Sequence, residues 1–127
     1  MVGVITNSGM GILGERFVDV SPTSPVISRF KVSTGTTPPS IGDTDVGNPG
    51  AAFSKTFEPG YPTFDSVNKE ISYRCTLLTT EDNGMLISEF GAFNSTPTMW
   101  CHDVFTAFSK SNTQIINFVG KDDLVNS

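Results

Sequence analysis

The stretch from Lys69 to Val119 decides the fold class, because it reads as four strands joined by three short turns. Its first strand, Ile71-Ser-Tyr-Arg-Cys-Thr-Leu77, alternates apolar and polar residues with the two-residue period of a half-buried strand. Glu81-Asp-Asn-Gly84 follows and carries an Asn-Gly pair, which is typical of a tight hairpin. Three further strands are expected, at Met85–Phe93, Met99–Ser109 and Gln114–Val119. The pattern predicts an antiparallel meander in which each strand pairs with the next.

The first half of the chain adds a helix, a strand and an aromatic segment. A short helix is expected at about residues 8–18, capped by Asn7 or Ser8, with a buried face formed by Ile12, Leu13 and Phe17. Val26–Ser33 predicts a strand with Phe30 and Val32 turned inward, and Phe53–Phe64 predicts an edge strand or a packed aromatic loop. The expected fold class is therefore all-β: a compact antiparallel β-sandwich or meander with one short N-terminal helix.

The size of the chain predicts one β domain covering residues 1–127, since 127 residues is a usual length for a single domain. No apolar run reaches the length of a membrane span, and the N-terminus lacks the basic and apolar regions of a signal peptide. Synthesis in a reducing cytoplasm is expected, so Cys75 and Cys101 should be free and buried.

Charge argues against nucleic acid and anionic membranes as partners. The formal net charge is -5, and the 8 basic residues are scattered between Arg16 and Lys121 without a cluster. Gly9-Met-Gly-Ile-Leu-Gly14 matches the spacing of a dinucleotide-binding loop. That site also requires a long crossover helix leading to a second parallel strand, which Pro22 and Pro25 exclude. No cofactor is expected.

Catalytic and metal-binding groups are hard to assemble from the sequence. His102 and Cys101 are neighbours in a strand, so their side chains point to opposite faces and cannot form a catalytic pair. A single His with two Cys does not complete a zinc site, Asp43-Thr-Asp45 lacks the remaining ligands of a calcium loop, and Asp122-Asp123 reads as a solvated tail. Glu89 stands in an apolar strand and should need a partner such as Lys110 or a backbone amide. We therefore expect neither a catalytic nor a metal site.

The segment Thr34–Ala51 is a long loop rich in Pro and Gly, which a compact domain keeps when contacts order it or when it binds a partner. Candidate residues of a protein interface lie mostly in this loop, with two aromatic residues outside it: Pro38, Pro39, Asp43, Asp45, Asn48, Pro49, Tyr61 and Trp100.

Three short motifs resemble small structural proteins from the tails, baseplates and fibre attachments of tailed bacteriophages. They are Ile5-Thr-Asn-Ser-Gly9 with Ile12-Leu13, Phe30-Lys-Val-Ser-Thr-Gly35 with Asp43-Thr-Asp45, and Glu89-Phe-Gly-Ala-Phe93 with Val104-Phe-Thr-Ala-Phe-Ser-Lys110. The resemblance implies a non-enzymatic virion protein made in the host bacterial cytoplasm. Separately, the strands Met85–Phe93 and Met99–Ser109 carry apolar residues on both faces, more than a small sandwich covers. We therefore expect a symmetric homo-oligomer, a trimer or hexamer, with contacts to other virion proteins through the Thr34–Ala51 loop.

Two alternatives remain open from the sequence. One is a capsid decoration protein, which no feature of the sequence separates from a tail or baseplate component. The other is a module that binds host-surface glycans, in which an exposed Trp100 or Tyr61 would stack on a sugar ring beside a carboxylate such as Asp103.

Overall fold

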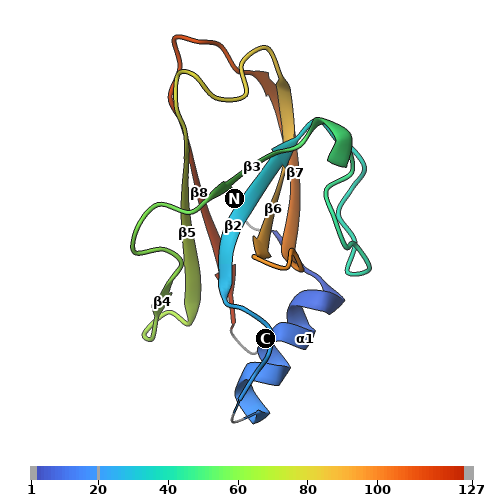
Figure 1. Ribbon diagram of the computed structural model, residues 1–127, viewed down its shortest axis with the longest axis vertical. Helices are drawn as coiled ribbons and strands as arrows, with labels where there is room; N and C mark the ends of the chain where they lie inside the picture. The colour runs from blue at the N-terminus through green and yellow to red at the C-terminus, as the bar shows by residue number, and fades with distance from the viewer. Residues whose placement is uncertain (1–2, 20, 125–127) are drawn as a thin grey trace.

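The structure is a computed structural model that describes residues 3–19 and 21–124. Its strands form two antiparallel sheets that face each other (Figure 1). The five-stranded sheet has the order β1-β7-β6-β2-β3, and the three-stranded sheet has the order β4-β5-β8. The elements in chain order are β1 (Val4–Ile5), α1 (Asn7–Val18), β2 (Ile27–Ser33), η1 (Pro49–Ala51), β3 (Phe53–Thr56), β4 (Thr63–Asp65), β5 (Glu70–Leu77), β6 (Leu86–Asn94), β7 (Met99–Ser109) and β8 (Ile116–Asp123). The predicted all-β sandwich with one short helix is confirmed.

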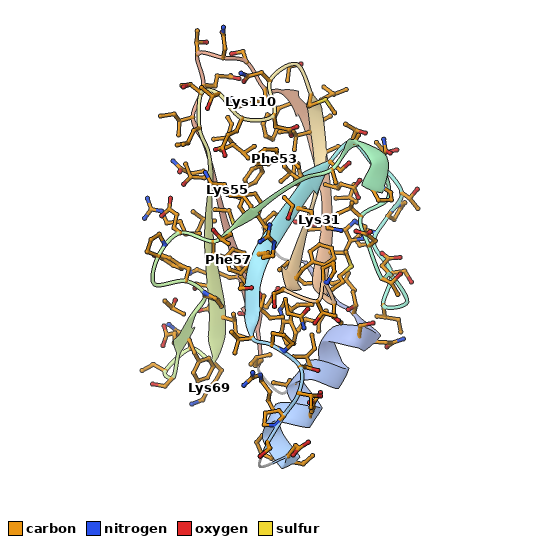
Figure 2. All side chains as sticks on the ribbon, in the orientation of Figure 1. Lys31, Phe53, Lys55, Phe57, Lys69 and Lys110 are labelled. Atoms are coloured by element: carbon orange, nitrogen blue, oxygen red, sulfur yellow. The ribbon has the colours of Figure 1, made fainter. Side chains whose placement is uncertain are left out.

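Aromatic side chains from both sheets fill the space between them. Phe30 of β2 stacks on Phe90 of β6 at a centroid distance of 6.0 Å and lies 6.4 Å from Phe118 of β8. Phe57, labelled in Figure 2, packs against Phe30 of one sheet and Tyr73 of the other. Each buried ring of this kind contributes about 1.5–3 kcal/mol through removal from water, so these contacts hold the two sheets together.

The strand alternation predicted which strand residues face the core, but only one of the three expected strand pairings is present. Tyr73, Cys75 and Leu77 face the core as expected, and β6 and β7 form the expected hairpin. The expected pairing of 71–77 with 85–93 is wrong, because β5 pairs with β8 along its whole length. The pairing of 99–109 with 114–119 is wrong for the same reason. Residues 78–85 and 110–115 each carry the chain to the opposite sheet, which places both inward faces against one core.

Helix α1 lies across one end of the sandwich and projects beyond it (Figure 1). Thr6 caps it instead of Asn7 or Ser8: its Oγ1 accepts from the Gly9 N–H at 3.0 Å and donates to the Met99 carbonyl at 2.8 Å. Ile12 and Leu13 pack inward as predicted. Phe17 does not pack inward: 88% of it is exposed. The last turns of the helix extend past the sheets, so none of the described strands lies beneath them.

Both cysteines are free and buried, as predicted. Burial in the apolar core raises the pKa of the Cys75 and Cys101 thiols. None of the helices formed by the described residues has the length and apolar character needed to cross a membrane.

Candidate functional site

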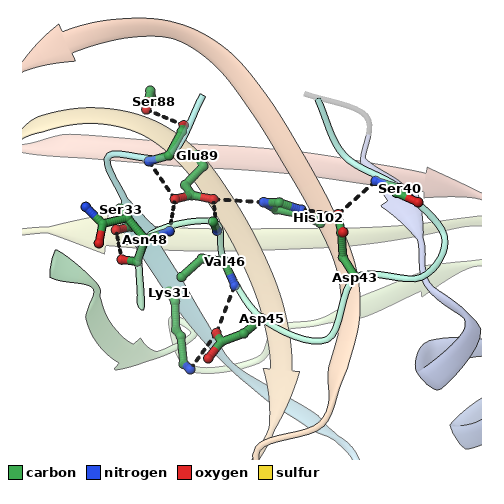
Figure 3. A network of polar contacts seen from close by, with 12 residues as sticks. Lys31, Ser33, Ser40, Asp43, Asp45, Val46, Asn48, Ser88, Glu89 and His102 are labelled. Atoms are coloured by element: carbon green, nitrogen blue, oxygen red, sulfur yellow. Dashed lines mark hydrogen bonds and ion pairs between the residues drawn. The ribbon is translucent and has the colours of Figure 1, made fainter. Parts of the chain in front are cut away.

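The loop between β2 and β3 folds over the outer face of the five-stranded sheet, where Glu89 of β6 and His102 of β7 meet it (Figure 3). Gly91 lies opposite His102 in the ladder, and Glu89 lies opposite Val104, so the two functional side chains project from the same face. The alternate residues Phe90, Ala92 and Cys101 point into the core. One pair of strands thus supplies both the apolar core and a polar anchor for the loop.

The Glu89 carboxylate is fully buried and receives four polar contacts. Its oxygens accept from the backbone N–H groups of Gly35 at 2.6 Å, Gly47 at 2.6 Å and Asn48 at 3.1 Å. The fourth contact, at 2.9 Å, is with Nε2 of His102. Burial alone would raise the pKa of Glu89, but these hydrogen bonds outweigh it and hold the pKa below its usual value. Glu89 is therefore an ionised group that fastens both ends of the loop.

The partner expected for Glu89 was Lys110 or a backbone amide, and the amide is confirmed. The prediction that Lys110 is the partner is wrong. Lys110 directly follows β7 at the end of the sandwich opposite α1 (Figure 2), whereas Glu89 lies opposite Val104 within the strand. The Lys110 Nζ instead donates to Asn83 Oδ1 and to the Ser111 carbonyl, each at 2.8 Å.

His102 links the buried acid to the middle of the loop. Its side chain is 3% exposed, and its Nδ1 lies 2.7 Å from Asp43 Oδ2. Both ring nitrogens therefore face carboxylates, and both contacts are hydrogen bonds when the imidazole carries a proton on each nitrogen. Burial raises the pKa of Asp43, yet the bonds from His102 and from the Ser40 N–H outweigh this effect, so the pKa lies below its ordinary value. Cys101 lies on the opposite face, as predicted, and does not pair with His102.

Further contacts fasten the rest of the loop. Lys31 Nζ pairs with Asp45 Oδ1 at 2.8 Å, and Val46 is buried against Phe93 and Met99. The Asn7 N–H donates to the Ile41 carbonyl at 2.7 Å, which ties the loop to the first turn of α1. The loop is thus fixed at its two ends and at its centre.

Residues 36–42 are the longest largely exposed run of the loop, beside a second exposed run at 47–50, and we call residues 36–42 the contact segment. It reads Thr36-Thr-Pro-Pro-Ser-Ile-Gly42 and contains no charged residue. Pro38 is exposed, Pro39 is half-buried, and Ile41 is 60% exposed. The segment is presented outward by the anchors on either side of it.

The other candidate interface residues divide between anchors and exposed positions. Asp43 and Asp45 anchor the loop through His102 and Lys31. Asn48 donates its backbone N–H to Glu89 and its Nδ2 to Thr34 Oγ1, while Pro49 is exposed at the start of η1. The sequence signal that could have found these anchors is the pair of polar residues Glu89 and His102 in two otherwise apolar strands.

Trp100 and Tyr61 lie away from this loop. Trp100 is 3% exposed, so the expectation of an exposed ring for sugar stacking is wrong. Its Nε1 donates to Asp122 Oδ2 at 2.7 Å, and Tyr73 also donates to that oxygen. Asp122 is therefore buried rather than part of a solvated tail, and burial raises its pKa. Tyr61 is half-buried beside Ile71 in an apolar pocket of ≈ 470 Å³ under α1.

Comparison with known proteins finds no family model, no curated protein and no solved structure that matches this chain. Among residues 3–19 and 21–124, no three His, Cys, Asp or Glu side chains are grouped so that they could hold a metal ion.

Proposed function

We propose that this protein is a non-enzymatic structural component of a bacteriophage virion, in a tail, baseplate or fibre attachment. It assembles with copies of itself and contacts other virion proteins through the contact segment. The observation that carries this proposal is the burial of the Glu89 carboxylate beneath the loop, where it accepts from three loop amides and contacts His102, which in turn contacts Asp43 of the loop.

A rigid loop favours binding because the cost of ordering it is met during folding. Fixing one residue's backbone costs about 1–2 kcal/mol, so a flexible loop of this length would lose much of its binding energy to ordering. Here Gly35, Asp43 and Gly47 are already fixed by Glu89 and His102. Long irregular loops in compact domains are usually functional, and this loop is anchored on both sides of its exposed part.

The composition of the contact segment fits a protein partner. Without Lys or Arg it offers no cationic group to phosphate or to an anionic membrane, whereas Ile41 offers an apolar anchor. Pro38 and Pro39 limit the conformations of the free segment, which lowers the entropy lost on contact.

The same observations lend little support to a glycan-binding module, because Trp100 is buried and serves the core. Catalysis by His102 finds no support either, since both of its nitrogens are occupied by carboxylates and the ring is enclosed. A capsid decoration protein would use the same kind of contact. The position of the protein in the particle distinguishes that alternative.

The test replaces residues 36–42 with a Gly-Ser segment of equal length and keeps Gly35 and Asp43. Particles are assembled with the variant as their source of this protein, and incorporation is measured by quantitative mass spectrometry. We expect an unchanged circular dichroism spectrum and a clear loss of incorporation. A matched control replaces Ser66-Val-Asn68, an exposed turn between β4 and β5, and should incorporate normally. Normal incorporation of the 36–42 variant would contradict the proposal.

A further inference from the structure

Helix α1 presents an apolar face to solvent. Met10, Phe17 and Val18 are 52%, 88% and 81% exposed, and Gly11 and Gly14 lie among them. At 100° per residue these five positions fall within about 120° of the helix circumference. Gly9 and Ile12 are buried on the opposite side against the sandwich. We call the five exposed positions the α1 outer face.

The charged residues of the helix lie outside these five positions and bond to the segment that follows the helix. Glu15 accepts hydrogen bonds from the N–H groups of Thr23 and Ser24, and Arg16 Nη2 donates to the Ser24 carbonyl at 3.0 Å. These bonds fix the last turn of α1 to the segment that follows it. The projecting helix is therefore held in place while its outer face stays apolar, an arrangement more typical of a contact surface than of a solvated one.

We propose that the α1 outer face binds the same face of a second copy, with the two helices antiparallel about a twofold axis at Gly14. Such an axis sets Met10, four residues before Gly14, against the partner's Val18. It also sets Gly11, three residues before Gly14, against the partner's Phe17. A Cβ added at Gly11 or Gly14 would meet no atom within 4 Å, so both positions are open hollows. Large side chains of each copy would then fill glycine hollows of the other.

Shape and charge both favour a second copy as the occupant. The face matches itself under a twofold rotation, and none of its five positions carries a charge. The antiparallel arrangement also opposes the two helix dipoles favourably. A membrane surface fits less well, because the chain has a net charge of -5 and none of the five positions is basic.

The inference rests on the proposed function for its claim of self-assembly and adds the surface that carries it. A twofold contact joins copies in pairs. It fits a hexamer built from three pairs, and it does not by itself close a ring of three.

Cysteine cross-linking of the full-length chain tests the geometry. Gly14→Cys should form a disulfide-linked dimer rapidly under mild oxidation, because the axis brings the two positions together. Gly11→Cys mixed with Phe17→Cys should cross-link faster than Gly11→Cys with itself. Wild type serves as the background, because Cys75 and Cys101 are buried, and Val67→Cys is the exposed control, at 84% exposure on the β4–β5 turn.

Analytical ultracentrifugation tests the association itself. Phe17→Ser should weaken wild-type dimerisation about tenfold or more, as expected for loss of a buried aromatic anchor, while Val67→Ser leaves it unchanged. Gly14→Ala should also weaken dimerisation, although it should raise the melting temperature of the monomer by favouring the helix. A wild-type monomer at all concentrations would overturn the inference. So would a dimer that ignores Phe17→Ser, or binding of the monomer to phosphatidylglycerol vesicles through this face.

Failure here and failure of the proposed function are separable. If the 36–42 replacement abolishes incorporation while the chain stays monomeric, the proposed function stands and the α1 contact is wrong. If α1 cross-links as described while the 36–42 replacement incorporates normally, the α1 contact stands and the assigned role of the contact segment is wrong.

Discussion

Glu89 is a buried acid whose desolvation is offset by the loop that covers it. Its three backbone donors come from Gly35, Gly47 and Asn48, which are 54, 42 and 41 residues away in the chain. A sequence can show that a lone acid in an apolar strand needs partners, as it does here. It cannot show that the partners are loop amides, because any backbone N–H can donate and residue type carries no signal for it.

Glu89→Gln should destabilise the protein by about 2–4 kcal/mol, because the amide has one accepting oxygen and leaves buried donors without a partner. Urea denaturation followed by tryptophan fluorescence measures the free energy of unfolding. The matched control is Glu70→Gln, whose oxygen lies 3.7 Å from Lys121 Nζ in a weak surface pair. That change should alter stability by less than about 1 kcal/mol. Equal effects of the two substitutions would show that the burial of Glu89 is not important.

The same carboxylates should make stability fall at acid pH. The pKa values of Glu89 and Asp43 are lowered in the folded state from their ordinary values of 4.5 and 3.8. Groups with lowered pKa bind fewer protons when folded, so their contribution is complete above about pH 4.5 and is lost as the pH falls through the lower folded values.

Asp82, Asp103 and Asp122 have raised pKa values, so their effect on stability at acid pH has the opposite sign. Comparing wild type with Glu89→Gln cancels their contribution and isolates that of Glu89. The difference in unfolding free energy between wild type and Glu89→Gln should be largest near neutral pH and should shrink below about pH 4. A difference that stays constant between about pH 7 and pH 3 would contradict an ionised Glu89 as the anchor.

At the scale of elements, the N-terminal half of α1 depends on one close approach to β7. A Cβ added at Gly9 would lie 2.3 Å from the Trp100 carbonyl oxygen, whereas a Cβ at Gly11 would meet nothing. Gly9→Ala should therefore lower the melting temperature, since backbone must shift to accept it. Gly11→Ala should stabilise the monomer by about 0.5–1 kcal/mol through helix propensity. Thermal unfolding of the two variants at low concentration checks this, and a neutral Gly9→Ala would show that α1 does not pack tightly on β7.

The elements also show where sequence reasoning succeeds and where it stops. Alternation placed Phe30, Val32, Tyr73 and Cys75 in the core, because burial of one strand face is a local property. Pairing is not local: the Asn-Gly signal at 83–84 predicted a hairpin, yet the chain crosses there to the other sheet. Phe17 was expected inside because its helical spacing matches Ile12 and Leu13. Its exposure depends on how far the sheets extend under the helix, which the helix sequence does not encode.

At the scale of the whole molecule, the same two strands support both the core and the loop. The inward faces of β6 and β7 build the sandwich, and their outward faces hold the segment between β2 and β3. Any change that loosens the Glu89 and His102 contacts should therefore release the contact segment before it unfolds the sheets. The same layout leaves α1 projecting from one end of the sandwich (Figure 1), with its outer face exposed.

His102→Gln separates these two effects. Glutamine cannot reach both Asp43 and Glu89 as the ring does, so residues 36–44 should exchange their amide hydrogens faster. The amides of β5 and β8, in the other sheet, should keep their protection. Uniform loss of protection in both sheets would show that His102 supports the fold as a whole rather than the loop.

The most direct test of the central claim is the backbone mobility of residues 36–42 in the wild-type protein, measured as ¹⁵N NMR order parameters in solution. The anchors at Gly35, Asp43 and Gly47 predict values near the ~0.85 of rigid backbone across the contact segment, close to those of β6 and β7. Values below about 0.6 there, with rigid sheets on either side, would mean that the loop is not held in a ready conformation and would contradict the account.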